Sequence, residues 1–264
     1  MRPPAEPRPR ATVALGLLQG PAELLPVSST AHVALLGRRL DGYARLGAAA
    51  RKEVAVALHA GSAVALALGG MPARPPRERW ALLALATAPV ALAGFALEGP
   101  IERRLSAPGA MAAGLVGGSI ALVAADRRPQ ERDAGDAAPG DALWIGLAQA
   151  AALAPGVSRS GAVRSAARSR GFTRAAAAEL AAETALPVLA GAAAVKGARL
   201  AARRPAGREL AALAAGALAA AASTMPARAV VRRAEPPAWV WAAYRITLAG
   251  AVLSDRGVRH NGRR

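Results

Sequence analysis

The sequence contains no cysteine, which excludes disulfide bonds, thiolate metal sites and cysteine nucleophiles. Aromatic residues make up only 3% of its 264 residues, although 53% are hydrophobic. Alanine supplies most of this hydrophobic content, and it favours a helix more than any other residue does. Few valine, isoleucine or aromatic residues remain to build strands. The composition therefore predicts an almost wholly helical protein.

The shortage of large side chains also bears on where these helices lie. Small side chains alone fill a water-soluble helical core poorly, because such cores are close-packed. A membrane bundle tolerates glycine and alanine at its helix contacts, since small residues let the helix backbones approach closely. The sequence therefore favours an all-α integral membrane protein.

Acidic residues are scarce: 17 stand against 34 basic ones, nearly all arginine, for a formal net charge of +17. Such an excess is typical of proteins that bind nucleic acid or an anionic membrane surface. The arginines form short clusters between apolar segments, from which they can reach lipid headgroups. These clusters lie at residues 38–39, 51–52, 74–79, 103–104, 203–204 and 232–233. We therefore expect contact with a membrane and not with nucleic acid.

Apolar segments recur along the chain, and several approach the roughly 20 residues that a helix needs to cross a bilayer core. They lie at about residues 11–36, 54–70, 80–97, 109–125, 142–154, 175–198, 209–224 and 239–253. The basic N-terminus before the first segment is similar to that of a signal peptide. Glu23 and Pro26 interrupt that segment and no convincing cleavage site follows, so we interpret it as part of the mature protein. We predict a single membrane domain over residues 1–264.

A polar linker at about residues 126–141 divides the chain into halves at about 11–125 and 142–254. The run Gly-Leu-Leu-Gln that ends at Gln19 recurs 130 residues later as Gly-Leu-Ala-Gln, ending at Gln149. Paired, broken apolar segments in two halves indicate a buried site between repeats. Non-helical backbone at membrane depth is tolerated where protein shields it or where it lines a cavity.

The first broken segment, from Gln19 to His32, gathers a carboxylate, three hydroxyl groups and an imidazole. Ionisable groups inside an apolar segment are costly and usually face a cavity, which makes this segment a candidate site. Gln19 and Glu23 are one helical turn apart and would share a helix face. A helix cap would explain Ser28 or Ser29 alone. It would not explain Glu23 and His32 together.

The second broken segment, residues 155–161, reads Pro-Gly-Val-Ser-Arg-Ser-Gly. Gly156 lets the backbone approach a ligand, and successive N–H groups can form an anion-binding nest. Arg159 would then bind phosphate oxygens with its two-pronged guanidinium. A turn that ends a helix is the alternative interpretation. Together, the two segments offer a cation, hydroxyls, an imidazole and a carboxylate able to hold a metal, as cleavage of a phosphate ester requires.

These two segments resemble the signatures of the bacterial undecaprenyl-diphosphatase family, also known as bacitracin-resistance proteins. Residues 19–32 are similar to (Glu/Gln)-x-x-x-Glu-Phe-Leu-Pro-Val-Ser-Ser-x-Gly-His. Residues 155–163 are similar to Pro-Gly-x-Ser-Arg-Ser-x-x-Thr. Weaker similarity at residues 60–62, 179–187 and 244–245 extends the resemblance over most of the chain.

The resemblance implies a helical bundle of two inverted repeats, each with a re-entrant helical hairpin. It implies hydrolysis of undecaprenyl diphosphate to undecaprenyl phosphate and inorganic phosphate, which recycles the lipid carrier for cell-wall synthesis. It further implies a divalent cation, Mg²⁺ or Ca²⁺, and a multi-pass protein of the bacterial plasma membrane whose active site faces outward. The polyprenyl diphosphate lipid and the membrane are the expected partners, and a homodimer is left open.

Carried over by position, the resemblance gives one set of catalytic residues and one set of substrate-binding residues. The catalytic set is Glu23, Ser29, His32 and Arg159; the substrate-binding set is Gln19, Ser28, Gly156, Ser158 and Ser160. We expect Arg159 to hold the phosphates and Glu23 to bind the metal or to anchor the site electrostatically. Ser29 and His32 are both candidates for the nucleophile.

The sequence also departs from the family pattern. Val163 replaces the threonine of the second signature, Leu24 the phenylalanine of the first, and Ala31 its glycine. His59 stands near a position where many members have glutamine, and we interpret it as a polar contact between helices. The alternative functions are a transporter that carries polyprenyl phosphate between leaflets, which broken helices suit, and a soluble protein that binds nucleic acid.

Overall fold

The computed structural model describes residues 6–69, 77–105, 107–127, 129–231 and 235–255. Within these ranges the chain forms α-helices and one short 3-10 helix, η1, without a β-strand. The helices are α1 (Pro9–Leu24), α2 (Ser29–Gly37), α3 (Ala48–Leu68), α4 (Arg77–Leu105), α5 (Pro108–Asp126), η1 (Ala134–Asp136), α6 (Pro139–Ala151), α7 (Arg159–Ser169), α8 (Arg174–Arg203), α9 (Gly207–Val231) and α10 (Ala238–Ser254). The predicted all-α class is confirmed. The predicted basic clusters at 74–76 and 232–233 lie outside the described residues.

Four of the described helices are long and apolar enough to cross a membrane: α5, α8 and most of α4 and α9. Only 17–33% of their most apolar stretches is buried inside the protein, so most of their apolar side chains point outward. Phe95 and Leu92 on α4, for example, are 89% and 72% exposed. Surfaces of this kind are stable against lipid and unfavourable in water. The chain is a multi-pass membrane protein.

The two halves of the chain have corresponding helices. Adding 130 to the first residue of α1, α2, α4 and α5 gives the first residue of α6, α7, α9 and α10. Contacts follow the same correspondence: α1 packs on α9 as α6 packs on α4, and α2 contacts α10 as α7 contacts α5. The remaining counterparts, α3 and α8, pack on each other. This exchange of partners supports the predicted repeats, whose boundaries stay a prediction.

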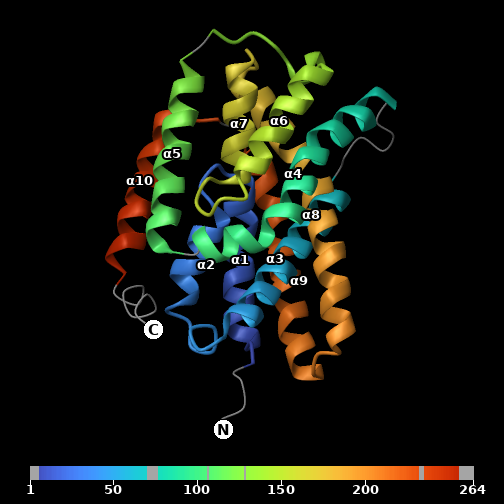
Figure 1. Ribbon diagram of the computed structural model, residues 1–264, viewed down its shortest axis with the longest axis vertical. Helices are drawn as coiled ribbons and strands as arrows, with labels where there is room; N and C mark the ends of the chain where they lie inside the picture. Colours follow the sequence, from blue (N-terminus) through green and yellow to red (C-terminus); the bar gives the residue numbers. More distant parts are fainter. Residues whose placement is uncertain (1–5, 70–76, 106, 128, 232–234, 256–264) are drawn as a thin grey trace.

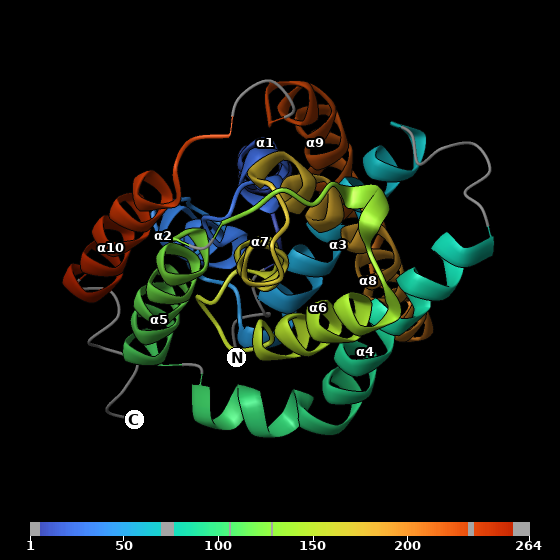
Figure 2. The ribbon, with the colours of Figure 1, turned by 90° about the horizontal axis from the view of Figure 1, so that it is seen from above.

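In each half, a broken helix pair ends inside the bundle. Figure 1 shows α1 and α6 entering from opposite ends of the molecule and turning near its middle. Figure 2 shows α7 near the centre of the surrounding helices. The breaks lie at residues 25–28 and 152–158, which contain Pro26 and the Pro155-Gly156 pair. Ser28 and Ser158, which precede α2 and α7, have left-handed φ angles of 71° and 69°. This hairpin geometry is the one that the resemblance implies.

Small residues set the distance between α1 and the neighbouring helix α9. A Cβ atom at Gly16 would overlap the carbonyl oxygen of Gly216 on α9. Gly61 of α3 meets the backbone of Ala217 on α9 in the same way. The glycine and alanine content therefore serves close helix packing, as the composition suggested.

We expect Gly16→Ala to destabilise the protein, because the added methyl group would force α1 away from α9. Overpacking of this kind costs about 1–3 kcal/mol. Gly191→Ala on α8 is the matched control, since a Cβ atom there meets no atom within 4 Å. The control should be neutral or slightly stabilising because alanine favours a helix. Thermal unfolding of both variants in detergent measures the difference, and equal stability would contradict the packing argument.

Candidate active site

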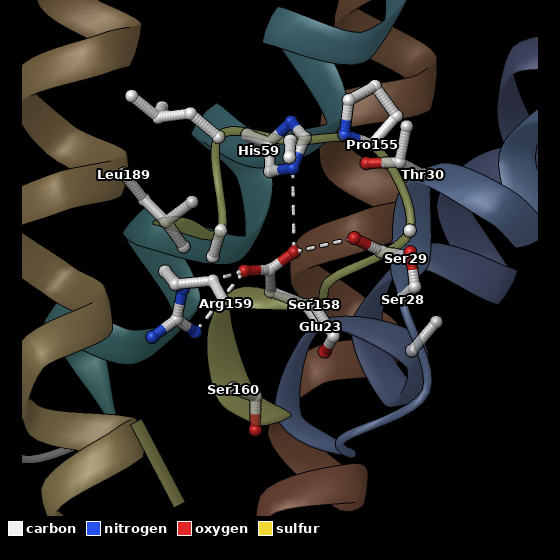
Figure 3. Close-up of a pocket in the computed structure, with 15 residues that line it drawn as sticks. Glu23, Ser28, Ser29, Thr30, His59, Pro155, Ser158, Arg159, Ser160 and Leu189 are labelled. Carbon is white, nitrogen blue, oxygen red and sulfur yellow. Dashed lines mark hydrogen bonds and ion pairs between the residues drawn. The ribbon is translucent and has the colours of Figure 1, made fainter. Parts of the chain in front are cut away.

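A cavity of about 190 Å³ lies where the two breaks meet. Its walls come from both broken segments and from α3 and α8. Figure 3 shows Glu23 near its centre, with Ser29 and His59 on one side and Arg159 on another. Gln19 lies one turn before Glu23 on α1 and donates a hydrogen bond to it. Residues from distant parts of the sequence therefore converge on one carboxylate.

Glu23 is buried, with 5% of its surface exposed, and both of its oxygens are bound. Oε1 accepts hydrogen bonds from Nε and Nη2 of Arg159, each at 3.3 Å. Oε2 accepts hydrogen bonds from Gln19 Nε2 at 3.0 Å and from Ser29 Oγ at 2.9 Å. Nε2 of His59 lies 3.4 Å from the same oxygen. Such pairing is what makes a buried carboxylate tolerable.

The second break is held in place by hydrogen bonds to the first. Ser160 Oγ donates to the carbonyl oxygen of Leu24 at 2.9 Å. Arg159 Nη1 donates to the carbonyl oxygen of Ala181 on α8 at 2.9 Å, which orients the guanidinium toward Glu23. Ser158 caps α7 by accepting the Gly161 N–H at 3.2 Å. The serines of this motif therefore have local structural partners as well as a place in the cavity wall.

Arg245 of α10 joins the two breaks. Its side chain is fully buried and donates to the carbonyl oxygens of Pro26 at 3.1 Å, Gly156 at 3.2 Å and Val157 at 2.8 Å. Bare carbonyl groups at membrane depth need such donors. In the sequence, Arg245 stands out only by a weak motif match at residues 244–245. A charged residue inside an apolar segment was the signal that could have identified it.

His32 does not line the cavity. Its Nδ1 lies 2.8 Å from the carbonyl oxygen of Ser28, and its Nε2 lies 2.7 Å from the hydroxyl of Tyr244. The rings of His32 and Tyr244 stack with centroids 5.6 Å apart. Of the predicted catalytic residues, Ser29 and Arg159 thus each contact Glu23, whereas His32 is turned toward α10. His59, interpreted from sequence as a contact between helices, makes that contact inside the cavity.

The donors of the cavity can be compared with what a divalent cation requires. Within the described ranges, no group of three or more His, Cys, Asp and Glu side chains converges. Mg²⁺ is commonly held by one or two carboxylates together with the phosphates of a substrate. Glu23 offers one carboxylate at the cavity. The residues therefore fit a cation that also binds a phosphate ligand, with Glu23 as its protein anchor.

The fold defines a polytopic membrane protein whose two broken segments enclose a cavity with an ion pair between Glu23 and Arg159. Residues 12–251 match the family described as Bacitracin resistance protein BacA, and the chain belongs to that family. This confirms the resemblance seen in the two motifs.

Curated relatives cover most of the chain. A protein of Geobacter sulfurreducens is 36% identical over 265 residues, spanning 91% of this chain and 95% of its own. A protein of Geobacter metallireducens is 38% identical over 202 residues, spanning 69% and 73%. A third, from Anaeromyxobacter dehalogenans, is 38% identical over 204 residues, spanning 69% and 68%. All three are named undecaprenyl-diphosphatase.

We expect Arg245→Met to destabilise the protein strongly. Each buried carbonyl group left without a donor costs about 1–3 kcal/mol. Arg245 donates to three such carbonyl groups in the two breaks. Arg199→Met is the matched control, because Arg199 is 61% exposed and pairs with Glu98 at the surface. The control should change stability by less than about 0.5 kcal/mol. Unfolding of both variants in detergent measures the two changes in stability. An Arg245→Met protein as stable as the wild type would contradict the role of Arg245 in holding the two breaks.

Proposed function

We propose that the protein hydrolyses undecaprenyl diphosphate to undecaprenyl phosphate and inorganic phosphate. The contact of Ser29 with Glu23, beside Arg159, carries this proposal, because it combines a nucleophile, a base and a phosphate-binding cation in one cavity. The relatives named undecaprenyl-diphosphatase support the same reaction. Their names give no support to the transporter alternative.

Ser29 is the nucleophile in this proposal. Its hydroxyl donates a hydrogen bond to Glu23 Oε2 at 2.9 Å. A base must lie within hydrogen-bonding distance of the nucleophile that it activates, and Glu23 meets this requirement. Ser29 Oγ bonds to the terminal phosphorus while its proton passes to Glu23. The bond from that phosphorus to the bridging oxygen breaks, and the lipid monophosphate leaves. Water then hydrolyses the phosphoserine and releases inorganic phosphate.

Arg159 binds the phosphate oxygens and stabilises the charge that develops on them. Before the ligand arrives, its guanidinium pairs with Glu23 Oε1. The ligand must therefore draw Arg159 partly from Glu23 toward the phosphates. A divalent cation, Mg²⁺ or Ca²⁺, held at Glu23 would supply further neutralisation of the diphosphate.

His32 is the other candidate nucleophile, and its contacts favour a positioning role instead. Both ring nitrogens are engaged, one with the Ser28 carbonyl oxygen and one with Tyr244. The first contact steadies the residue next to Ser29, where the backbone is left-handed. His32 thus positions Ser29 by holding the backbone of Ser28, the residue before it.

The proposed setting is the bacterial plasma membrane, with the cavity open to the outer face. Outward-pointing apolar side chains on α4, α5, α8 and α9 support a lipid environment. Glu23, Ser29 and Arg159, the residues of the proposed reaction, all line the cavity. The lipid is the expected partner, and nucleic acid is not.

Purified protein in detergent should release phosphate from undecaprenyl diphosphate in the presence of Mg²⁺ or Ca²⁺. Ser29→Ala should lower the rate by about 10²-fold or more, since it removes the nucleophile that the base activates. Arg159→Ala should lower it by about 10²–10³-fold. Ser165→Ala is the matched control, because Ser165 bonds only to the Gly161 carbonyl oxygen outside the cavity. Folded wild-type protein without phosphate release in either metal would overturn the proposal.

The nucleophile can be identified separately by quenching the reaction and mapping the phosphorylated residue by mass spectrometry. We expect the phosphoryl group on Ser29, because its oxygen lines the cavity. Phosphorylation of His32 would contradict this assignment and would require the ring to leave Tyr244. The His32→Asn variant serves as a check: it should still form phosphoserine, at a reduced rate.

A further inference from the structure

His59 lies in the cavity wall, yet the proposed reaction assigns it no task. It projects from α3 toward Glu23, as Figure 3 shows. Its Nδ1 lies 2.7 Å from the carbonyl oxygen of Ala55, one turn earlier on the same helix. A carbonyl oxygen only accepts hydrogen bonds, so Nδ1 carries the hydrogen and donates it. In its neutral form, the ring presents the lone pair of Nε2 to the cavity.

This lone pair faces a second electron-pair donor. Nε2 of His59 lies 3.4 Å from Oε2 of Glu23, which is long for a hydrogen bond. Two ligands that each lie about 2.0–2.1 Å from one ion, at a tetrahedral angle, stand roughly 3.3–3.4 Å apart. A histidine that binds a metal through one nitrogen usually donates its other N–H to a carbonyl or carboxylate. His59 and Ala55 show that arrangement.

We propose that His59 Nε2 and Glu23 Oε2 form a two-donor chelate for the divalent cation of this site. The inference rests on the proposed function in one respect: the diphosphate supplies further ligands. Imidazole nitrogen suits transition metals such as Zn²⁺, Fe²⁺ and Ni²⁺, whereas Mg²⁺ and Ca²⁺ prefer oxygen. His59 is therefore a specificity-determining residue that makes this chain prefer a transition metal such as Zn²⁺ to Ca²⁺, and Mn²⁺ serves as its paramagnetic probe.

The other contacts of Glu23 leave room for this chelate. Arg159 occupies Oε1, so the two oxygens of the carboxylate face different partners. Oε2 accepts from Gln19 and Ser29, and a cation there would replace one of these donors. Gln19 is the donor that would move, because the Ser29 hydroxyl keeps its contact with Glu23 in the proposed reaction. The cation would then lie next to the proposed nucleophile.

The repeat correspondence supplies a contrast within the chain. Leu189 of α8 stands 130 residues after His59 and lines the same cavity. The imidazole is therefore a feature of the first half of the chain and is absent from the corresponding position of the second half.

The test uses full-length wild-type protein in detergent, with Mn²⁺ as the probe and without any phosphate ligand. Electron paramagnetic resonance should show one bound Mn²⁺ per chain, with pulsed-resonance modulation from an imidazole nitrogen. His59→Gln should lose that modulation and bind Mn²⁺ at least about tenfold more weakly. Its affinity for Ca²⁺ should change by less than about threefold, since Ca²⁺ relies on oxygen ligands. His32→Gln is the matched control, because His32 lies outside the cavity wall, and it should keep the nitrogen signal.

Bound Mn²⁺ without nitrogen modulation in the wild-type protein would overturn the chelate, and this outcome depends on no variant folding. Equal Mn²⁺ affinity in the wild type and His59→Gln would also overturn it, and would leave His59 as an ion-pair partner of Glu23. Phosphate release is measured separately. An active enzyme without nitrogen ligation refutes the chelate alone, and nitrogen ligation without phosphate release refutes the proposed function alone.

Discussion

The arrangement of this protein depends on how two interruptions of helical backbone are satisfied inside a membrane. Each exposed peptide group there costs several kcal/mol unless it finds a partner. Arg245 supplies that partner for Pro26 in one break and for Gly156 and Val157 in the other. Because one rigid guanidinium binds both breaks, it also sets their separation. The positions of the cavity residues follow from this.

The charged side chains of the cavity likewise depend on each other. An isolated carboxylate at this depth would be expensive, and so would an isolated guanidinium. Glu23 and Arg159 offset each other, although they are 136 residues apart in the chain. Arg159 therefore has two tasks in the proposed reaction: it stabilises the empty site, and it binds the phosphate. While Arg159 moves toward the phosphate, Ser29 and His59 remain beside Glu23.

The features that a short stretch of sequence reveals could be predicted: the helices, the two breaks and the ionisable residues at them. Composition indicated the helices, and Pro26 and Gly156 marked the breaks. Glu23 and Arg159 were conspicuous as ionisable residues at such breaks. The two histidines were harder to place. His32 is only three residues from Ser29, but its ring is directed to Tyr244 by the turn of α2. His59 enters the cavity because glycine contacts bring α3 close to α9 and α1, which no local pattern reveals.

The correspondence between the halves has one more consequence. Six pairs of positions 130 residues apart line the cavity, and two of them, Ala22 with Ala152 and Ser28 with Ser158, are identical. Three other pairs differ in charge or polarity: Glu23 with Leu153, Ser29 with Arg159, and His59 with Leu189. A frame built from equivalent halves would accept a ligand equally well in two opposite orientations. This lining removes that ambiguity: its negative pole lies on the first half and its positive pole on the second. We therefore expect an anionic head group to bind with its phosphates toward Arg159 and the second half of the chain.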